Sequence, residues 1–214
     1  VCFLTLVALD RKLRENNIKS NVDLKLYLDL VALATICDVV PLRFLNRAFV
    51  STGLKVMGWR QNHGLKALFD LSNVREIPNE QNLGYVIGPR INAAGRLGNS
   101  NLGVKLLCSN TEVEASELAD KLNQLNEKRK DIQNRVLESA IDKLDKLNTS
   151  SKNVILLADT EWHEGVIGIV AGRIKDRFHK PSIIIAINKD GIGKGSSRSV
   201  SGFDIGSAII AAQQ

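Results

Sequence analysis

The fold is decided by the stretch VILLADTEWHEGVIGIVAGRIKDRFHKPSIIIAI, which is residues 154–187. Two short apolar runs, at 154–158 and 183–187, read as strands. Between them, residues 166–178 carry isoleucine and valine at helical spacing, which indicates a helix with one apolar face. A strand, a helix and a strand in so short a stretch predict a parallel pair of strands joined by a right-handed crossover. A short glycine-rich strand at 192–198 and a helix at 203–212 are expected to follow.

A long helix is expected upstream of this unit. Residues 111–147 contain neither proline nor glycine, and apolar or small residues recur there mostly in steps of three and four. This spacing predicts one helix of about 55 Å, at 1.5 Å per residue, with a narrow apolar stripe. Residues 148–151 have the composition of a linker. Earlier in the chain, helices are expected at 1–15, 23–36, 44–58 and 63–71, and a further helix opens at 79–84.

The composition is that of a globular protein with a moderate positive charge. The 214 residues are 44% hydrophobic and carry a net charge of +6, which favours polyanionic partners without requiring them. Aromatic residues make up 5%, so stacking of many bases on aromatic side chains is not expected. No apolar run is long enough to cross a membrane, and no signal peptide is evident. Cys2, Cys37 and Cys108 are far apart in apolar surroundings, which predicts buried free thiols in a reducing cytoplasm.

The first candidate site lies in residues 83–98, which read LGYVIGPRINAAGRLG. Here Arg90, Asn92 and Arg96 stand among small residues, which let a ligand approach the backbone closely. The planar fork of arginine donors matches two phosphate oxygens at once, so the segment is suited to holding a nucleic-acid backbone. A glycine-rich turn with two solvated arginines is the alternative, and the residues alone leave both open.

Asp38 is a candidate metal ligand. It follows the strongly apolar run 30–34 and precedes Pro41, which ends regular structure. A buried carboxylate is costly unless a cation or several N–H groups meet it. A metal ion would satisfy Asp38, but an arginine or a helix terminus would do so as well.

Two further candidates lie in the second half of the chain. His163 follows the first expected strand and precedes the crossover helix, where open α/β sheets contact their ligands and where a helix N-terminus favours anions. Residues 191–199 combine glycines and serines with a lysine and an arginine, which is the makeup of a phosphate nest. A loop histidine and a flexible basic turn are the corresponding alternatives.

Four blocks of the sequence, in this order and spacing, resemble the DHH phosphoesterase family, and in particular its single-strand-specific 5′→3′ exonucleases. The blocks are LVALATICDVVPL at 30–42, GPRINAAGR at 88–96, WHEGVIGI at 162–169 and GSSRSVSG at 195–202. The resemblance implies an α/β fold of two α/β domains joined by a long connecting helix. The catalytic domain would end in residues 1–110, the helix would span 111–148, and the substrate-binding domain would begin in 149–214. Both ends of the chain fall inside apolar helical patterns, so an internal piece of a longer protein, truncated at both ends, is expected.

The resemblance also implies a two-metal site, with Mn²⁺ or Mg²⁺, that activates water against a phosphodiester. Asp38 would be a catalytic metal ligand, and the family's Asp-x-Asp and Asp-His-His motifs, which supply other ligands, do not occur in these residues. The chain alone is therefore expected to have no nuclease activity. The nucleic acid would be bound by Arg90, Asn92, Arg96, His163, Ser197, Arg198 and Ser199.

The expected function is 5′→3′ hydrolysis of single-stranded DNA in repair and recombination. The expected setting is a cytoplasmic monomer that has single-stranded DNA and DNA-repair proteins as partners and does not bind a membrane. One alternative is a family phosphodiesterase acting on short oligonucleotides or cyclic dinucleotides, although the long helix fits the exonucleases better. The other is a binding scaffold that kept the fold and lost its metals, which the residues upstream of Val1 would reveal.

Overall fold

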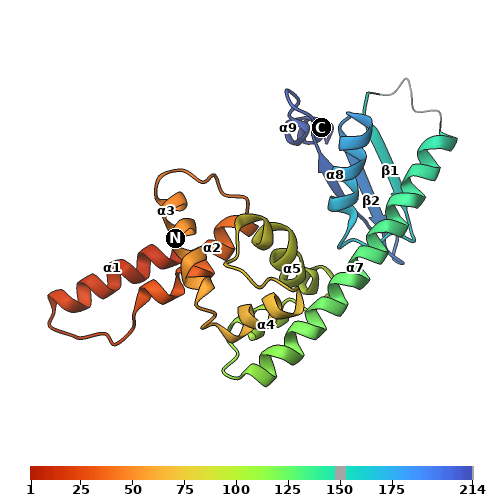
Figure 1. The fold of residues 1–214 in the computed structure, drawn as a ribbon. Coiled ribbons are helices and arrows are strands. Elements are labelled where there is room, and N and C mark those ends of the chain that lie inside the picture. Colours follow the sequence, from red (N-terminus) through yellow and green to blue (C-terminus); the bar gives the residue numbers. More distant parts are fainter. Residues whose placement is uncertain (148–152, 214) are drawn as a thin grey trace. The chain divides into compact units, whose positions relative to one another are not determined.

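A computed structural model describes residues 1–147 and 153–213 (Figure 1). The chain divides into two compact units: unit 1 is Val1–Gly95 with Asn99–Gln124, and unit 2 is Arg96–Gly98 with Leu125–Gln214. The expected linker at 148–151 lies outside the described residues. Among those that are described, no helix is both long and apolar enough to span a bilayer.

The described elements of unit 1 are all helical, and the helices expected at 1–15, 44–58 and 63–71 are confirmed. The segment expected as one helix at 23–36 is instead a single 3₁₀ turn followed by an α-helix. The elements are α1 (Cys2–Glu15), the 3₁₀ turn η1 (Leu24–Tyr27), α2 (Leu28–Cys37), α3 (Phe44–Gly58), α4 (His63–Leu71), the π-helix η2 (Asn82–Ile87), α5 (Gly88–Arg96) and α6 (Asn101–Leu107).

Close crossings of these helices depend on small residues. A Cβ atom on Gly53 of α3 would lie 2.1 Å from the carbonyl oxygen of Leu28 in α2, so only glycine fits there. Gly88 of α5 has the same relation to Cys37 of α2, whose Sγ would be 2.6 Å from a Cβ atom. The arginine- and glycine-rich segment is helical from Asn82 to Arg96, and Gly88 allows it to pack closely against α2.

The long helix is confirmed as α7 (Glu112–Lys146), and its residues contribute to both units (Figure 1). In unit 1 it buries Ala115, Leu118, Ala119 and Leu122, and in unit 2 it buries Val136, Ala140 and Leu144. Between these two apolar groups the buried residues are polar: Asn126 is 1% exposed and Gln133 is 3% exposed. The apolar stripe is thus interrupted by a polar layer near the middle of the helix.

Unit 2 contains a three-stranded sheet in the order β1 (Ile155–Asp159), β2 (Ser182–Ile187), β3 (Gly193–Arg198). The strands β1 and β2 are parallel and are joined through α8 (Ile167–Phe178), while β3 runs antiparallel to β2. The predicted strand–helix–strand unit is confirmed. One core joins the C-terminal half of α7 to β1, β2 and α8, around residues such as Leu144, Val170 and Ile184. The last helix, α9 (Ile205–Ala211), starts at Asp204, which caps it by accepting from two backbone N–H groups.

The prediction of a mixed α/β fold is confirmed for the chain, although its strands lie in unit 2 and the described part of unit 1 has none. The prediction of buried thiols is wrong for two of the three cysteines. All three are free, but Cys2 and Cys108 are exposed and Cys37 is half-buried. The reason is that α1 and the end of α6 leave these side chains on the outside of unit 1 although their neighbours in sequence are apolar.

Candidate nucleic-acid interface

Asp38 forms the C-terminal cap of α2, and its side chain is exposed, not buried as the apolar sequence around it suggested. The next residue, Val39, has φ +54°, a left-handed conformation that a β-branched residue rarely adopts. A carboxylate at a helix C-terminus also faces the negative end of the helix dipole. None of the salt bridges among the described residues includes Asp38. Such locally unfavourable positions are typical of functional sites.

The described residues do not form a metal site by themselves. They contain no group of three or more His, Cys, Asp or Glu side chains that could hold a metal ion. From this part of the chain, a metal bound at Asp38 would receive too few ligands, and the donor set does not fit one. The role of Asp38 as a catalytic metal ligand stays a prediction that depends on residues outside the described ones.

Arg90 and Asn92 differ in how free their side chains are. The guanidinium of Arg90 donates to Asn123 Oδ1 (3.0 Å) and to the carbonyl oxygen of Val86 (2.7 Å), so it links α5 to α7. Asn92 is exposed and has no side-chain hydrogen bond among those of the described residues. Two of the five N–H donors of Arg90 are therefore used inside unit 1, whereas Asn92 remains available to a ligand.

Arg96 lies against the loop that precedes α8. Its Nη1 donates to the carbonyl oxygen of Gly165 at 3.3 Å. The contact is also tight between the backbones, because a Cβ atom on Gly165 would lie 2.1 Å from the carbonyl oxygen of Arg96. Arg96 is nevertheless exposed, so part of its guanidinium can reach a ligand.

Arg129 of α7 is held by the buried polar layer. Its Nη2 donates to Asn126 Oδ1 (3.0 Å) and its Nη1 to Gln133 Oε1 (3.2 Å), while its buried Nε has no partner. Burial, followed by the nearby charges of Arg96 and Arg173, lowers the pKa of Arg129. Arg96 and Arg173 are thus close enough to Arg129 to disfavour its charge, which Glu127 favours, and a bound anion would stabilise that charge further.

Arg198 and Ser196 of β3 lie beside the first turn of α8. A Cβ atom on Gly168 would lie 3.0 Å from Ser196 Oγ and 3.1 Å from Arg198 Nη2. Arg198 also donates to Ser196 Oγ at 3.2 Å and to the carbonyl oxygen of Ser197 at 2.7 Å. A hydroxyl, a guanidinium and a helix N-terminus therefore meet at Gly168, and these are groups that bind phosphate.

The two other predicted serines lie differently. Because side chains alternate along a strand, Ser197 points to the face of β3 opposite Ser196 and Arg198. The hydroxyl of Ser199 donates to the carbonyl oxygen of Phe203 and closes the turn after β3. Neither shares the position at Gly168.

His163 is exposed, and its Nδ1 accepts a hydrogen bond from the backbone N–H of Gly165 at 3.0 Å. In the neutral ring this bond leaves the proton on Nε2, which is then a donor. The next residue, Glu164, pairs with Lys194 of β3 at 2.6 Å, and this lysine lowers the pKa of Glu164. The pair connects the loop before α8 to the sheet.

Unit 2 thus brings three predicted residues, Arg96, His163 and Arg198, to one short segment, residues 163–168, which is the loop before α8 and the start of that helix. The sequence interpretation did not include Arg129 and Arg173, and it quoted Gly168 and Ser196 within longer segments without naming them as binding residues. A binding role for Ser196 beside Arg198 could have been predicted from the sequence, because residues two apart on a strand share a face. Among the described residues no salt bridge includes Arg96, Arg173 or Arg198, so these three charges are available to a polyanion, whereas Glu127 acts on Arg129.

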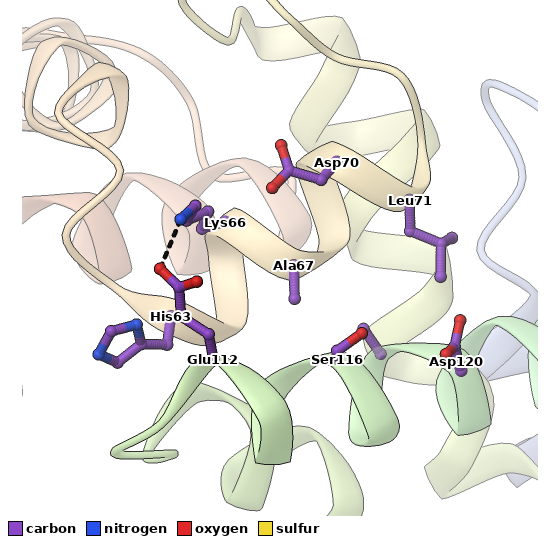
Figure 2. Close-up of a pocket in the computed structure, with 9 residues that line it drawn as sticks. His63, Lys66, Ala67, Asp70, Leu71, Glu112, Ser116 and Asp120 are labelled. Carbon is purple, nitrogen blue, oxygen red and sulfur yellow. Dashed lines mark hydrogen bonds and ion pairs between the residues drawn. The ribbon is translucent and has the colours of Figure 1, made fainter.

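A separate groove of about 390 Å³ lies in unit 1 between α4 and the start of α7. Figure 2 shows Lys66 of α4 paired with Glu112 of α7, at 2.5 Å, on its wall. Asp70 and Asp120 also line it, so acidic groups outnumber the one lysine. This charge disfavours a nucleic-acid backbone, and none of the predicted site residues lies there.

Known proteins are similar to this chain over most of its length. Residues 151–214 match the model of the DHHA1 domain. The single-stranded-DNA-specific exonuclease RecJ of Dickeya dadantii is 39% identical over 220 aligned residues, which cover 98% of this chain and 38% of the relative. That of Haemophilus influenzae is 42% identical over 94% of this chain and 36% of the relative.

Solved structures agree with the sequence comparison. The crystal structure of RecJ in complex with Mg²⁺ from Thermus thermophilus has a TM-score of 0.85 at 33% identity, covering 100% of this chain and 32% of that one. A structure of exonuclease RecJ bound to manganese has a TM-score of 0.77 and is covered to 50%. The chain spans roughly a third of the length of the curated relatives it matches.

Proposed function

We propose that this chain, which belongs to the RecJ family of DHH phosphoesterases, is part of an enzyme that hydrolyses single-stranded DNA from its 5′ end. In this proposal unit 2 holds the strand through its phosphates, and Asp38 contributes one ligand to a Mn²⁺ or Mg²⁺ site completed by residues outside this chain. Bound metal would supply an activated water and offset the charge that develops on the phosphodiester.

The observation that carries the proposal is that Arg96, which donates to Gly165 in the loop before α8, and Arg173 both lie near Arg129 of α7. Arg96 and Arg173 disfavour the charge of Arg129, Glu127 offsets them in part, and a phosphate backbone would relieve the remaining repulsion. Arg198 and Ser196 extend the same donor chemistry to the start of α8. The relatives carry names that state single-stranded DNA as substrate, in agreement with this chemistry.

Several finer statements belong to the same proposal. Residues 1–110 would be the end of the catalytic domain, 111–148 the connecting helix and 149–214 the start of the substrate-binding domain. Arg90, Asn92, His163, Ser197 and Ser199 would contact the strand together with Arg96 and Arg198. The protein would act as a cytoplasmic monomer with DNA-repair proteins as further partners.

The proposal is tested by fluorescence anisotropy with a labelled 30-nucleotide single strand and its duplex, titrated with the chain between 50 and 200 mM salt. Tighter binding of the single strand, with an affinity that falls steeply with salt, is expected because counterions are released from the backbone. An absence of binding, or equal binding of the duplex, would contradict the proposal. Stronger competition by cyclic dinucleotides than by the 30-mer would favour the small-substrate phosphodiesterase.

A further inference from the structure

A second groove, which we call the α7 groove, lies within unit 2 and has a volume of about 370 Å³. This volume lies in the range of small-ligand sites. It is formed by one face of α7 and by the loop that follows β1. Its lining residues are Ile132, Arg135, Val136, Ser139, Glu161, Trp162 and His163.

The inner wall of the α7 groove is apolar and firmly held. Trp162 is 5% exposed, and its Nε1 donates to Ser139 Oγ at 3.1 Å. Lys143 Nζ lies 5.2 Å from the centre of the indole and pairs with Asp159 at 2.7 Å. The indole is therefore fixed from two sides, and a ligand meets a preformed wall.

The rim of the α7 groove carries two donors. Arg135 is exposed, and its Nε has one contact, at 3.5 Å, with the carbonyl oxygen of Asp131. His163 presents Nε2–H, because its Nδ1 is occupied by the N–H of Gly165. Glu161 also lines the groove and its carboxylate is an acceptor, so the lining can meet both a phosphate and the amino edge of a base.

The groove also continues the proposed strand-binding surface. Arg129, Ile132, Val136 and Ser139 are spaced by three, four and three residues, which puts them on one face of α7. His163 belongs both to the groove and to the loop that Arg96 contacts through Gly165. A strand whose phosphates lie at Arg96 and Arg129 would therefore have its next nucleotides beside this groove.

We propose that the α7 groove binds one nucleobase of the single strand, with the flanking phosphate held by Arg135 and His163. This inference rests on the proposed function and adds a base subsite to it. The chemistry fits a base, which has apolar faces for Ile132, Val136 and Trp162 and a polar edge for Ser139 and Glu161. Unpaired bases are free to leave the stack, so the subsite accepts single strands and not intact duplex.

The test uses Trp162 as a reporter. The chain has two tryptophans, and Trp59→Phe in unit 1 leaves Trp162 as the sole source of indole emission. This variant is titrated with a thymidine 12-mer and with an abasic 12-mer that has the same phosphates, while anisotropy of labelled oligonucleotide measures binding. We expect the thymidine strand to change Trp162 emission and to bind on the order of tenfold tighter than the abasic one.

A pair of variants completes the test. Arg135→Ala should lower the affinity for the thymidine strand several-fold and weaken the emission change, whereas Lys130→Ala, on another face of α7, removes the same charge and should do neither. If both strands bind equally and leave Trp162 emission unchanged, or if Arg135→Ala binds as the wild type does, the base subsite is wrong while the proposed function stands. If neither strand binds at all, both proposals fail.

Discussion

The carbonyl oxygen of Arg96 occupies the space that a side chain at position 165 would need, because a Cβ atom on Gly165 would lie 2.1 Å from it. Within unit 2, Arg96 and the loop before α8 are in backbone contact there. The same loop carries His163, so the position of one proposed DNA-binding residue depends on a glycine two residues away.

Gly165→Ala is expected to force this loop away from Arg96 and to destabilise the chain by about 1–3 kcal/mol, the range for overpacking a tight contact. Urea unfolding measures the change, and the affinity for single-stranded DNA should fall with it. Gly172→Ala is the matched control, since nothing lies within 4 Å of a Cβ atom at that position of α8. It should stabilise by up to about 1 kcal/mol, because alanine favours helix over glycine. Equal effects of the two variants would contradict the close approach.

Alanine variants of Arg129 and Arg173 are expected to differ, because the first should lower stability whereas the second should lower only the affinity for DNA. Arg129→Ala leaves the buried amide oxygens of Asn126 and Gln133 without a donor, which should cost about 1–3 kcal/mol in urea unfolding. Arg173 is exposed, so Arg173→Ala should leave the free energy of unfolding within about 0.5 kcal/mol of the wild type. The affinity of Arg173→Ala for single-stranded DNA should nevertheless fall, with a salt slope shallower by about 0.7. An unchanged salt slope would remove Arg173 from the interface.

Asp38→Asn is expected to have opposite effects on stability and on activity. Removing a carboxylate from the C-terminus of α2 should stabilise the chain by about 0.3–1 kcal/mol, because the helix dipole no longer opposes a negative charge. In the intact protein the same change should nearly abolish release of mononucleotides from 5′-labelled single strands in Mn²⁺, with binding retained. Unchanged turnover would remove the metal-ligand assignment.

The chain alone, in the same assay, is expected to release no mononucleotides, since the described residues provide no complete metal site. A time course with Mn²⁺ and the 5′-labelled strand is the measurement, and intact protein is the positive control. Product that accumulates in proportion to the amount of the chain would show that the catalytic set is present after all.

Asp29 gives a pH-dependent prediction. It is 7% exposed, and burial raises its pKa even though the N–H of Leu30 donates to it. A raised pKa in the folded state means that the charged carboxylate destabilises the fold above that pKa, and that the penalty disappears below the ordinary value of 3.8. Asp29→Asn should therefore unfold at higher urea than the wild type at pH 7, and the difference should vanish near pH 3.

Exposed Asp23 provides the control for that series. Its side chain caps η1 by accepting from the N–H of Lys25, and asparagine caps a helix equally well. Asp23→Asn should change the urea midpoint little at either pH. A stabilisation at pH 7 equal to that of Asp29→Asn would show that net charge, rather than burial at position 29, is the cause.

The sequence predicts elements far better than it predicts partners. The strand–helix–strand unit and α7 follow from local periodicity, which residues near in sequence determine. The hydrogen bond from Arg90 to Asn123 joins residues that are far apart in sequence and lie on different helices. Sequence patterns therefore could not reveal that Arg90, which was predicted to bind phosphate, uses part of its guanidinium inside the fold. The polar layer of α7 left a partial signal, since the apolar recurrence pauses between Leu125 and Ile132. The exposure of Asp38 could not be predicted, because apolar neighbours in sequence do not determine which side of a helix end faces solvent.

The left-handed backbone of Val39 has a consequence for engineering. Glycine adopts that conformation without steric conflict, so Val39→Gly removes a strain of about 1–2 kcal/mol beside Asp38. Selection for thermal stability alone would therefore tend to replace Val39 with glycine. Libraries intended to raise stability while keeping the proposed nuclease activity should hold position 39 constant, or test every stable variant for turnover.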